Sequence, residues 1–188
     1  DGQGYVGQAS YRAWGNGPGG GQSGNSSWAG GGAGHGGAGG SGDSGANAGG
    51  ASYGSSLEPA ALGSSGGNWE GYLSGAGGGA LRLIVDDTLQ LDGEISANGA
   101  NGERHAGGGG GGSLWVEAHR LSGGGLLRAV GGSTQASHAG GGGGGGRIAV
   151  YYAEDGGFSG FAASTAAGGS GYQAGAVGTV VFLHVDGA

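Results

Sequence analysis

Two closely similar stretches of the chain join a histidine to a run of glycines, a combination that could do chemistry. HAGGGGGGS begins at His105 and HAGGGGGGGR begins at His138, thirty-three residues later. A third histidine, His35, interrupts another glycine-rich stretch. Because imidazole is the commonest transition-metal ligand, these three side chains are candidate metal ligands. The pattern favours the alternative, in which each histidine is only a side chain carried by a structural glycine-rich segment and binds no metal.

Aspartates gather where the chain is expected to turn between extended segments. Asp86 and Asp87 are adjacent, and Asp92 and Asp155 follow other apolar runs. Aspartate oxygens together with backbone carbonyls can bind Ca²⁺, which makes Asp86 and Asp87 candidate calcium ligands. Neither EF-hand spacing nor a glycine-aspartate nonapeptide is present, and aspartate is common in tight turns for local reasons. We therefore expect no cofactor, with calcium as the alternative.

The sequence offers no constellation that singles out a catalytic site. Literal G-x-G-x-x-G patterns start at Gly2 and Gly15, but neither lies between a strand and a helix, as dinucleotide binding requires. A Walker A loop is excluded because the chain has no lysine. The spacing of the glutamates does not distinguish a pair suited to glycoside hydrolysis. We expect a protein that is not an enzyme, without catalytic or cofactor-binding residues.

Composition limits the partners of the chain. Sixty of its 188 residues are glycine, and six arginines face thirteen acidic residues, for a net charge of −7. Nucleic acid is an improbable partner, because phosphate binding needs a basic patch. No apolar stretch approaches the ~20 residues that span a bilayer. Low charge, a Gly/Ser/Asn-rich composition and the missing lysine suggest an extracellular or cell-surface location. A chain that opens at Asp1 looks processed, or cut from a larger protein.

The second half of the chain repeats with a nearly constant period. Apolar runs start at Ala80, Ser113, Arg147 and Thr179, at steps of 33, 34 and 32 residues. In each unit a glycine run leads to a strand, a short turn (such as Asp86-Asp87), a second extended piece and a glycine-rich return. Alternation of apolar residues favours strands over helices. These features predict an all-β solenoid with a period of about 33 residues. The alternative is an antiparallel β-sandwich.

The first half follows a period of three. From Gly30 to Ala48 every third residue is small, the next register is mostly glycine, and the third carries side chains such as His35. A polyproline-II helix has three residues per turn and no internal hydrogen bonds. Two bare edges would let such helices pack closely and bond backbone to backbone. We expect residues 1–79 to form a glycine-rich polyproline-II region, integrated in one domain with the strand repeats of 80–188.

Aromatic side chains of the first half could contact a ligand. Trp14, Trp28 and Trp69 are spread among small residues, and indole rings stack well on sugars. They are therefore candidate glycan contacts. The alternative is that these rings cover a thin core.

Several stretches, in this order along the chain, resemble a glycine-rich domain of very large secreted or surface-attached bacterial proteins. They are GGAGHGGAGG, ASYGSSLEPAALGSSGG, GGGALRLIVDDTLQLDGEISANGANG, GGGGSLWVEAHRLSGGG, GGGGGGGRIAVYY and GGSGYQAGAVGTVVFL. The resemblance implies a structural or adhesive role at a surface and no catalytic residue. The triplet segment is also similar to polyglycine-II bundles of snow-flea antifreeze proteins and phage tail-tip adhesins. The missing cysteines and irregular triplets depart from the antifreeze type and place ice binding in doubt.

The last apolar run suggests how the protein acts. A solenoid terminates in unpaired strand edges, and an uncapped edge can pair with another subunit. TVVFLHV is the last strand, so the candidate self-association residues are Thr179, Val180, Val181, Phe182, Leu183 and Val185. A head-to-tail contact can continue into a filament. We therefore expect an extracellular structural protein that forms a homopolymer, such as a surface filament or matrix. The alternative is an adhesin or glycan-binding module of a larger surface protein.

Overall fold

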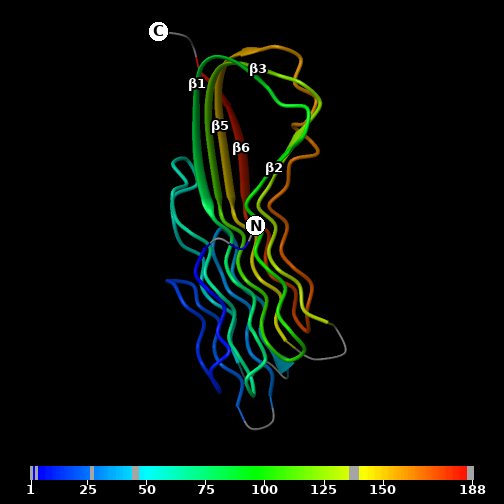
Figure 1. Ribbon diagram of the computed structural model, residues 1–188. Helices are drawn as coiled ribbons and strands as arrows, with labels where there is room; N and C mark the ends of the chain where they lie inside the picture. The colour runs from blue at the N-terminus through cyan, green and yellow to red at the C-terminus, as the bar shows by residue number, and fades with distance from the viewer. Residues whose placement is uncertain (1, 3, 26–27, 44–46, 136–139, 186–188) are drawn as a thin grey trace.

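The protein is elongated and divides into a strand part and a glycine-rich part, as Figure 1 shows. The computed structural model describes residues 2, 4–25, 28–43, 47–135 and 140–185. Among these residues no α-helix forms. Consequently, the described part of the chain contains no helix long and apolar enough to cross a membrane.

Six strands build the first part, and all of their pairings are parallel. They are β1 (Ala80–Gln90), β2 (Glu94–Ser96), β3 (Ser113–Ser122), β4 (Leu126–Arg128), β5 (Arg147–Asp155) and β6 (Thr179–His184). The long strands form one sheet in the order β1-β3-β5-β6, and β2 pairs with β4 in a second sheet. The predicted solenoid is confirmed, with roughly three turns and a period of about 33 residues. Parallel pairing excludes the antiparallel sandwich.

The predicted repeat units coincide with the strands of the larger sheet. Ala80, Ser113, Arg147 and Thr179 are the first residues of β1, β3, β5 and β6, and they lie opposite one another. Equivalent residues therefore stack in rungs across the sheet. A constant repeat length thus aligns equivalent residues of successive coils.

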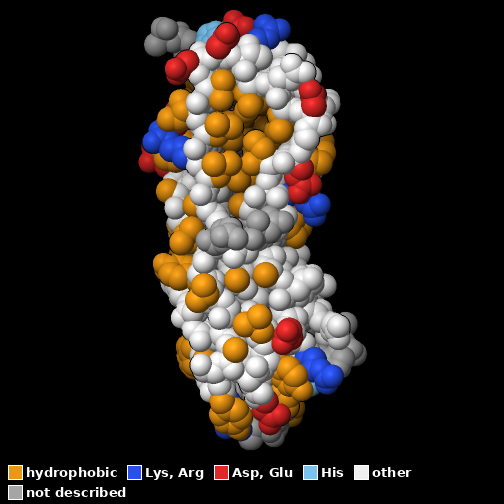
Figure 2. All heavy atoms as spheres, viewed as in Figure 1, with side chains coloured by type: hydrophobic (Ala, Val, Ile, Leu, Met, Phe, Trp, Pro, Cys, Tyr) orange, Lys and Arg blue, Asp and Glu red, His pale blue; other side chains and the backbone are white. Residues whose placement is uncertain are grey.

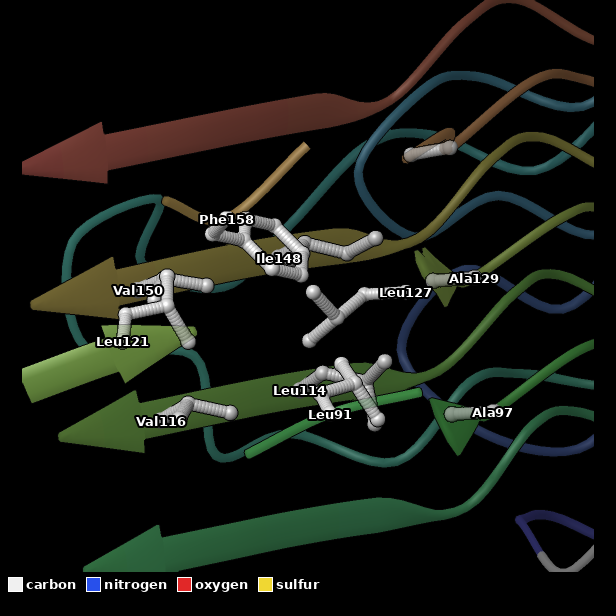
Figure 3. Close-up of a cluster of buried hydrophobic side chains, with 11 residues drawn as sticks. Leu91, Ala97, Leu114, Val116, Leu121, Leu127, Ala129, Ile148, Val150 and Phe158 are labelled. Atoms are coloured by element: carbon white, nitrogen blue, oxygen red, sulfur yellow. The ribbon is translucent and has the colours of Figure 1, made fainter. Parts of the chain in front are cut away.

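Alternate side chains of the sheet form the hydrophobic core. One rung places Leu114 beside Ile148, and both side chains are fully buried. Another rung pairs Val116 with Val150. Figure 3 shows that the opposite wall of the coil contributes Leu127 and its neighbours to the same cluster. Burial of each such side chain contributes about 1.5–3 kcal/mol, so the strand part is stabilised in the ordinary way.

Two of the local predictions in this part were wrong. Asp86 and Asp87 do not form a turn but lie inside β1, where the register with β3 shifts between Val85 and Thr88. Parallel pairing on one side and solvent on the other let the strand absorb the extra residue as a bulge. The stretch 158–164, expected to be extended like the second strand of the earlier units, contains no strand, and only Thr165 bridges to β4.

The glycine-rich part is held by backbone hydrogen bonds that repeat every three residues. Along 107–112 the amides donate in turn to three different neighbours: Gly107 and Gly110 to the segment 64–67, Gly108 and Gly111 to the segment 141–144, and Gly109 and Gly112 to the segment 97–100. A helix with three residues per turn presents its amides in three directions, and each direction here meets another segment. The predicted polyproline-II bundle is thus present.

Three parallel segments form a closed ring at the centre of this bundle. Gly30 and Ala33 donate to the segment that starts at His105, Gly108 and Gly111 donate to 141–144, and Gly141 and Gly144 donate back to Gly30 and Ala33. The glycine runs 107–112 and 140–146 are thus structural segments beside the segment 30–33 of the first half.

The period-three run is not one helix, however. It folds back at a turn where the His35 amide donates to the Gly37 carbonyl, and farther along the Gly42 amide donates to the Asn47 carbonyl. The bundle also takes in the return segments of the strand repeats, such as 97–102 and 129–134, so both halves of the sequence contribute to it.

Candidate functional site: the two open ends of the solenoid

The first open end of the sheet is β1. One edge of β1 pairs with β3, and no described strand pairs with the other. On its core-facing side Leu81 is 41% exposed, although its rung partners Leu114 and Ile148 are fully buried. Figure 2 shows the hydrophobic side chains of this end gathered in a hollow. Leu83 and Ile95 pack against the core here and are only partly buried. This end thus exposes a core layer that a further coil could cover.

The second open end is β6, which contains most of the predicted self-association residues. β6 pairs with β5 on one edge only. Val180 stacks on Ile148 and Phe182 stacks on Val150, and both outer side chains are only partly buried. Phe182 also packs against the ring of Phe161, with 4.9 Å between centroids. A layer of apolar side chains therefore lies open at this end too.

The outward side of β6 holds the remaining candidates. Thr179 accepts a hydrogen bond from the Arg147 guanidinium over 3.3 Å. Val181 and Leu183 alternate with the core-facing residues and are half-buried, on the outer face of the sheet. Val185 lies beyond the strand, is 41% exposed, and its amide still donates to the Tyr152 carbonyl. The six predicted residues therefore divide between the core layer and the outer surface.

Sequence analysis identified β6 but missed β1 as its counterpart. Any parallel stack has two ends, so the repeat that predicted an open last strand also implies an open first strand. Leu81, Leu83 and Val85 have the same alternation as the last strand. The signal was present in the sequence.

The candidate metal ligands are not brought together. His35 is fully buried, and its Nδ1 donates to the Gly111 carbonyl over 2.6 Å. His105 lies six residues before Gly111 in the chain, in a turn where the Ala106 amide donates to the Glu103 carbonyl. There its ring packs edge-on against Trp69, with centroids 4.6 Å apart. His138 lies outside the described residues.

The carboxylate candidates are exposed and show no ligand geometry. Asp86 and Asp87 lie in the bulge of β1, and the Asp87 carboxylate accepts a hydrogen bond from Thr88. Asp92 accepts hydrogen bonds from Gln90 and from the Gly124 amide, and these lower the pKa of its carboxyl group. Within the described ranges no three histidine or acidic side chains are grouped so that they could hold a metal ion.

A buried polar junction connects the two parts of the molecule instead. The Arg147 Nε at the start of β5 donates to the Tyr53 carbonyl over 2.9 Å, and the Tyr53 ring lies 4.8 Å from that of His35. Burial lowers the pKa of His35, and the Arg147 charge acts in the same direction, whereas the hydrogen bond to Gly111 opposes them. Burial also raises the pKa of Tyr53 and lowers that of Arg147. No signal of residue type or spacing pointed to this junction.

The predicted glycan-contact residues gather around the end of the bundle remote from the sheet. Trp69 stacks with Tyr72 at an interplanar angle of 13°, and its Nε1 donates to the Asn25 carbonyl. The backbone of Asn25 in turn pairs with Trp28. Trp14 is 61% exposed. It lies near Trp69 in the fold, because the carbonyl of the preceding residue, Ala13, accepts a hydrogen bond from the Asn68 amide.

Shallow depressions also mark the outer face of the sheet. One of about 270 Å³ is lined by Ile84, Glu117, Tyr151 and neighbouring side chains. Tyr151 donates to the Leu57 carbonyl, and Glu117 pairs with Arg82 at 2.8 Å. Tyr151 and Glu117 are thus already engaged with the protein itself.

Comparison of the chain with protein-family models, with curated proteins and with solved structures found no match.

Proposed function

We propose that this chain is a non-enzymatic structural subunit that associates head to tail with copies of itself, in an extracellular filament or matrix. One observation carries the proposal: at each end of the solenoid the last strand has one edge that no described strand pairs with, and a layer of apolar side chains there is only partly buried. Natural proteins usually shorten, charge or cover such edges, and neither β1 nor β6 is covered by a described strand.

The rungs of the sheet specify the register of the contact. Within the chain, the first residues of successive strands lie opposite one another. If β1 of a second copy continues this ladder on β6, then Val180 meets Leu81 and Phe182 meets Leu83 of that copy. Each pair is apolar and core-facing, so the joined stack would bury both layers. Because this contact is heterologous, it repeats at every added subunit.

A matched pair of variants on β1 tests the proposal. Leu81→Lys places a charge in the layer that the next copy would bury, and the lysine stem can reach solvent in the single subunit. Ile84→Lys is the control, because Ile84 is on the same strand, faces outward and is 55% exposed. We expect the wild type and Ile84→Lys to form regular fibres in electron microscopy and Leu81→Lys to stay dispersed with an unchanged melting temperature.

Mixing two blocked variants makes the test more specific. Val180→Lys blocks the β6 end and leaves β1 intact, whereas Leu81→Lys does the reverse. Equimolar mixing should give heterodimers joined through one native contact and no longer species, as measured by light scattering after size exclusion. A wild type that remains monomeric at every concentration would refute self-assembly of this chain.

The alternative function, as an adhesin or glycan-binding module, is supported by the exposed aromatic residues of the bundle. Trp14 and Tyr11 are both more than half exposed, and Trp28 is partly exposed. Exposed planar rings present faces on which sugars can stack. Glycan-array binding that disappears in Trp14→Ala, with self-association unchanged, would favour this function.

A further inference from the structure

The bundle, like the sheet, has two ends, and its end segments are connected directly to the strands at the open ends. The segment 173–178 leads into β6, and the segment 74–79 leads into β1. Residues 4–8 run antiparallel along 74–77: the Gly77 amide donates to the Tyr5 carbonyl, and the Ser74 amide to the Gln8 carbonyl. Stacking of β6 on β1 of a second copy would place 173–178 beside 74–79 of that copy, and 4–8 lies along that segment.

The segment 173–178 has a row of amide donors without partners. The Gly175 and Gly178 amides donate to the return segment 166–169, and the Ala176 amide donates to the Ala38 carbonyl. The remaining direction of this three-residue helix belongs to Ala174 and Val177, whose amides have no partner among the described residues. Both residues are exposed, Val177 to 74%. This row of N–H groups thus points out of the molecule.

The segment 4–8 has the complementary row of acceptors. The Tyr5 and Gln8 carbonyls accept from 74–77, and the Val6 carbonyl accepts from the Asn16 side chain. The Gly4 and Gly7 carbonyls accept nothing from the residues that the structure describes. Both glycines are partly exposed at the surface of the bundle. Two acceptors three residues apart therefore oppose two donors three residues apart, each row spanning roughly 9 Å.

We propose that these rows join successive copies through the bundle: the Ala174 amide donates to the Gly7 carbonyl, and the Val177 amide to the Gly4 carbonyl, of a second copy. The pairing is antiparallel, because 4–8 is antiparallel to 74–77, whereas 173–178 runs in the same direction as that segment through an unbroken series of parallel neighbours. The inference rests on the proposed function and specifies a second contact for it.

Apolar side chains flank both rows. At one end of the bundle, Val177 and Tyr172 are both exposed. At the other end, Val6 is 69% exposed and the neighbouring Tyr5 is exposed as well. Water competes for exposed backbone groups, and flanking apolar side chains would exclude it from the new hydrogen bonds. A second copy of this chain is thus the occupant whose backbone spacing and apolar surface both match.

Proline provides a selective test, because it removes the amide and keeps the backbone angle of a polyproline-II helix. We would compare the wild type with the double variant Ala174→Pro/Val177→Pro by sedimentation equilibrium and electron microscopy. The variant should keep the circular dichroism and melting temperature of the wild type, whereas its self-association should weaken by roughly 10- to 100-fold, as expected for the loss of two hydrogen bonds.

Two control variants separate the donor row from other effects. Val177→Ala shortens the side chain and keeps the amide, so its association should weaken less than that of the double proline variant. Ala176→Pro removes an amide that donates inside the molecule, so it should lower the melting temperature. If the wild type assembles and the folded double proline variant assembles equally well, this inference is wrong and the strand contact alone remains. If the wild type never assembles, the proposed function itself fails.

Hydrogen exchange tests the same contact without any substitution. The Ala174 and Val177 amides should exchange rapidly in the Leu81→Lys monomer and become protected in the wild-type assembly. The Ala176 amide should be protected in both, because its partner is internal. Rapid exchange at 174 and 177 in the assembly would overturn the inference even if the proline variants failed to fold.

Discussion

The strand part and the glycine part of this molecule hold neighbouring segments together by different interactions. Both align segments that run back and forth along one axis (Figure 1). In the strand part, side chains such as Leu114 and Ile148 fill the space between the two sheets. In the glycine part, hardly any side chain lies between segments, and carbonyls approach the α-carbons of neighbouring glycines directly. One part is stabilised by apolar burial, and the other by a dense network of backbone hydrogen bonds.

This difference predicts different tolerances. A side-chain core loses energy in proportion to the atoms removed, and its neighbours relax in part. In a lattice of closely packed backbones, no flexible side chain can move aside. One added methyl group must therefore displace a whole neighbouring segment. Ordering glycine also costs more entropy than ordering any other residue, so the lattice has little stability to spare.

The largest effect should come from adding a methyl group to the lattice. In Gly143→Ala the new Cβ would lie 2.0 Å from the Gly109 carbonyl oxygen. The clash involves backbone on both sides and should cost more than about 4 kcal/mol, the range of exceptional substitutions. Chemical denaturation should show a protein that is unfolded or nearly so. Gly93→Ala is the control, because its Cβ would meet nothing within 4 Å, and it should change stability by less than about 0.5 kcal/mol.

A smaller effect should come from removing side-chain atoms in the strand part. Leu114→Ala leaves a cavity at a fully buried rung and should cost about 2–5 kcal/mol. Urea denaturation measures this change, with Leu81→Ala as the matched substitution at the partly exposed end of the same rung. If Leu114→Ala and Leu81→Ala lower the free energy of unfolding equally, the greater burial of Leu114 would add nothing to stability.

The smallest effect concerns the junction where the two parts meet. Burial lowers the pKa of His35 in the folded state below the ordinary histidine value of 6.5, so unfolding takes up a proton below that pH. Stability should therefore be complete above pH 6.5 and should fall as the pH drops from there towards the folded pKa. The slope from this one group cannot exceed about 1.4 kcal/mol per pH unit.

Thermal unfolding between pH 4 and 8 would measure this dependence. His35→Gln keeps an amide that can donate towards the Gly111 carbonyl and removes the titration. The variant should lose a part of the slope that the wild type shows below pH 6.5. Identical profiles for the two proteins would mean that the junction does not sense pH.

The sequence alone determined the ladder of the molecule. A period of about 33 residues with apolar alternation specifies parallel rungs, because equivalent residues can share a core only by stacking. The three-residue glycine period likewise specified helices with bare edges, since only bare edges allow backbone to meet backbone. From these two periods it followed that the last strand, Thr179–His184, has an open edge.

Only the tertiary structure decided which segments meet and what remains unpaired. Polyglycine has no side chains to encode a partner, so the sequence could not place 4–8 along 74–77 or turn the run at His35 back on itself. The junction of His35, Tyr53 and Arg147 joins residues from distant parts of the chain that no spacing relates. The unpaired donors of 173–178 and acceptors of 4–8 depend on how all the segments of the bundle are placed, so they are a property of the whole lattice rather than of any stretch of sequence.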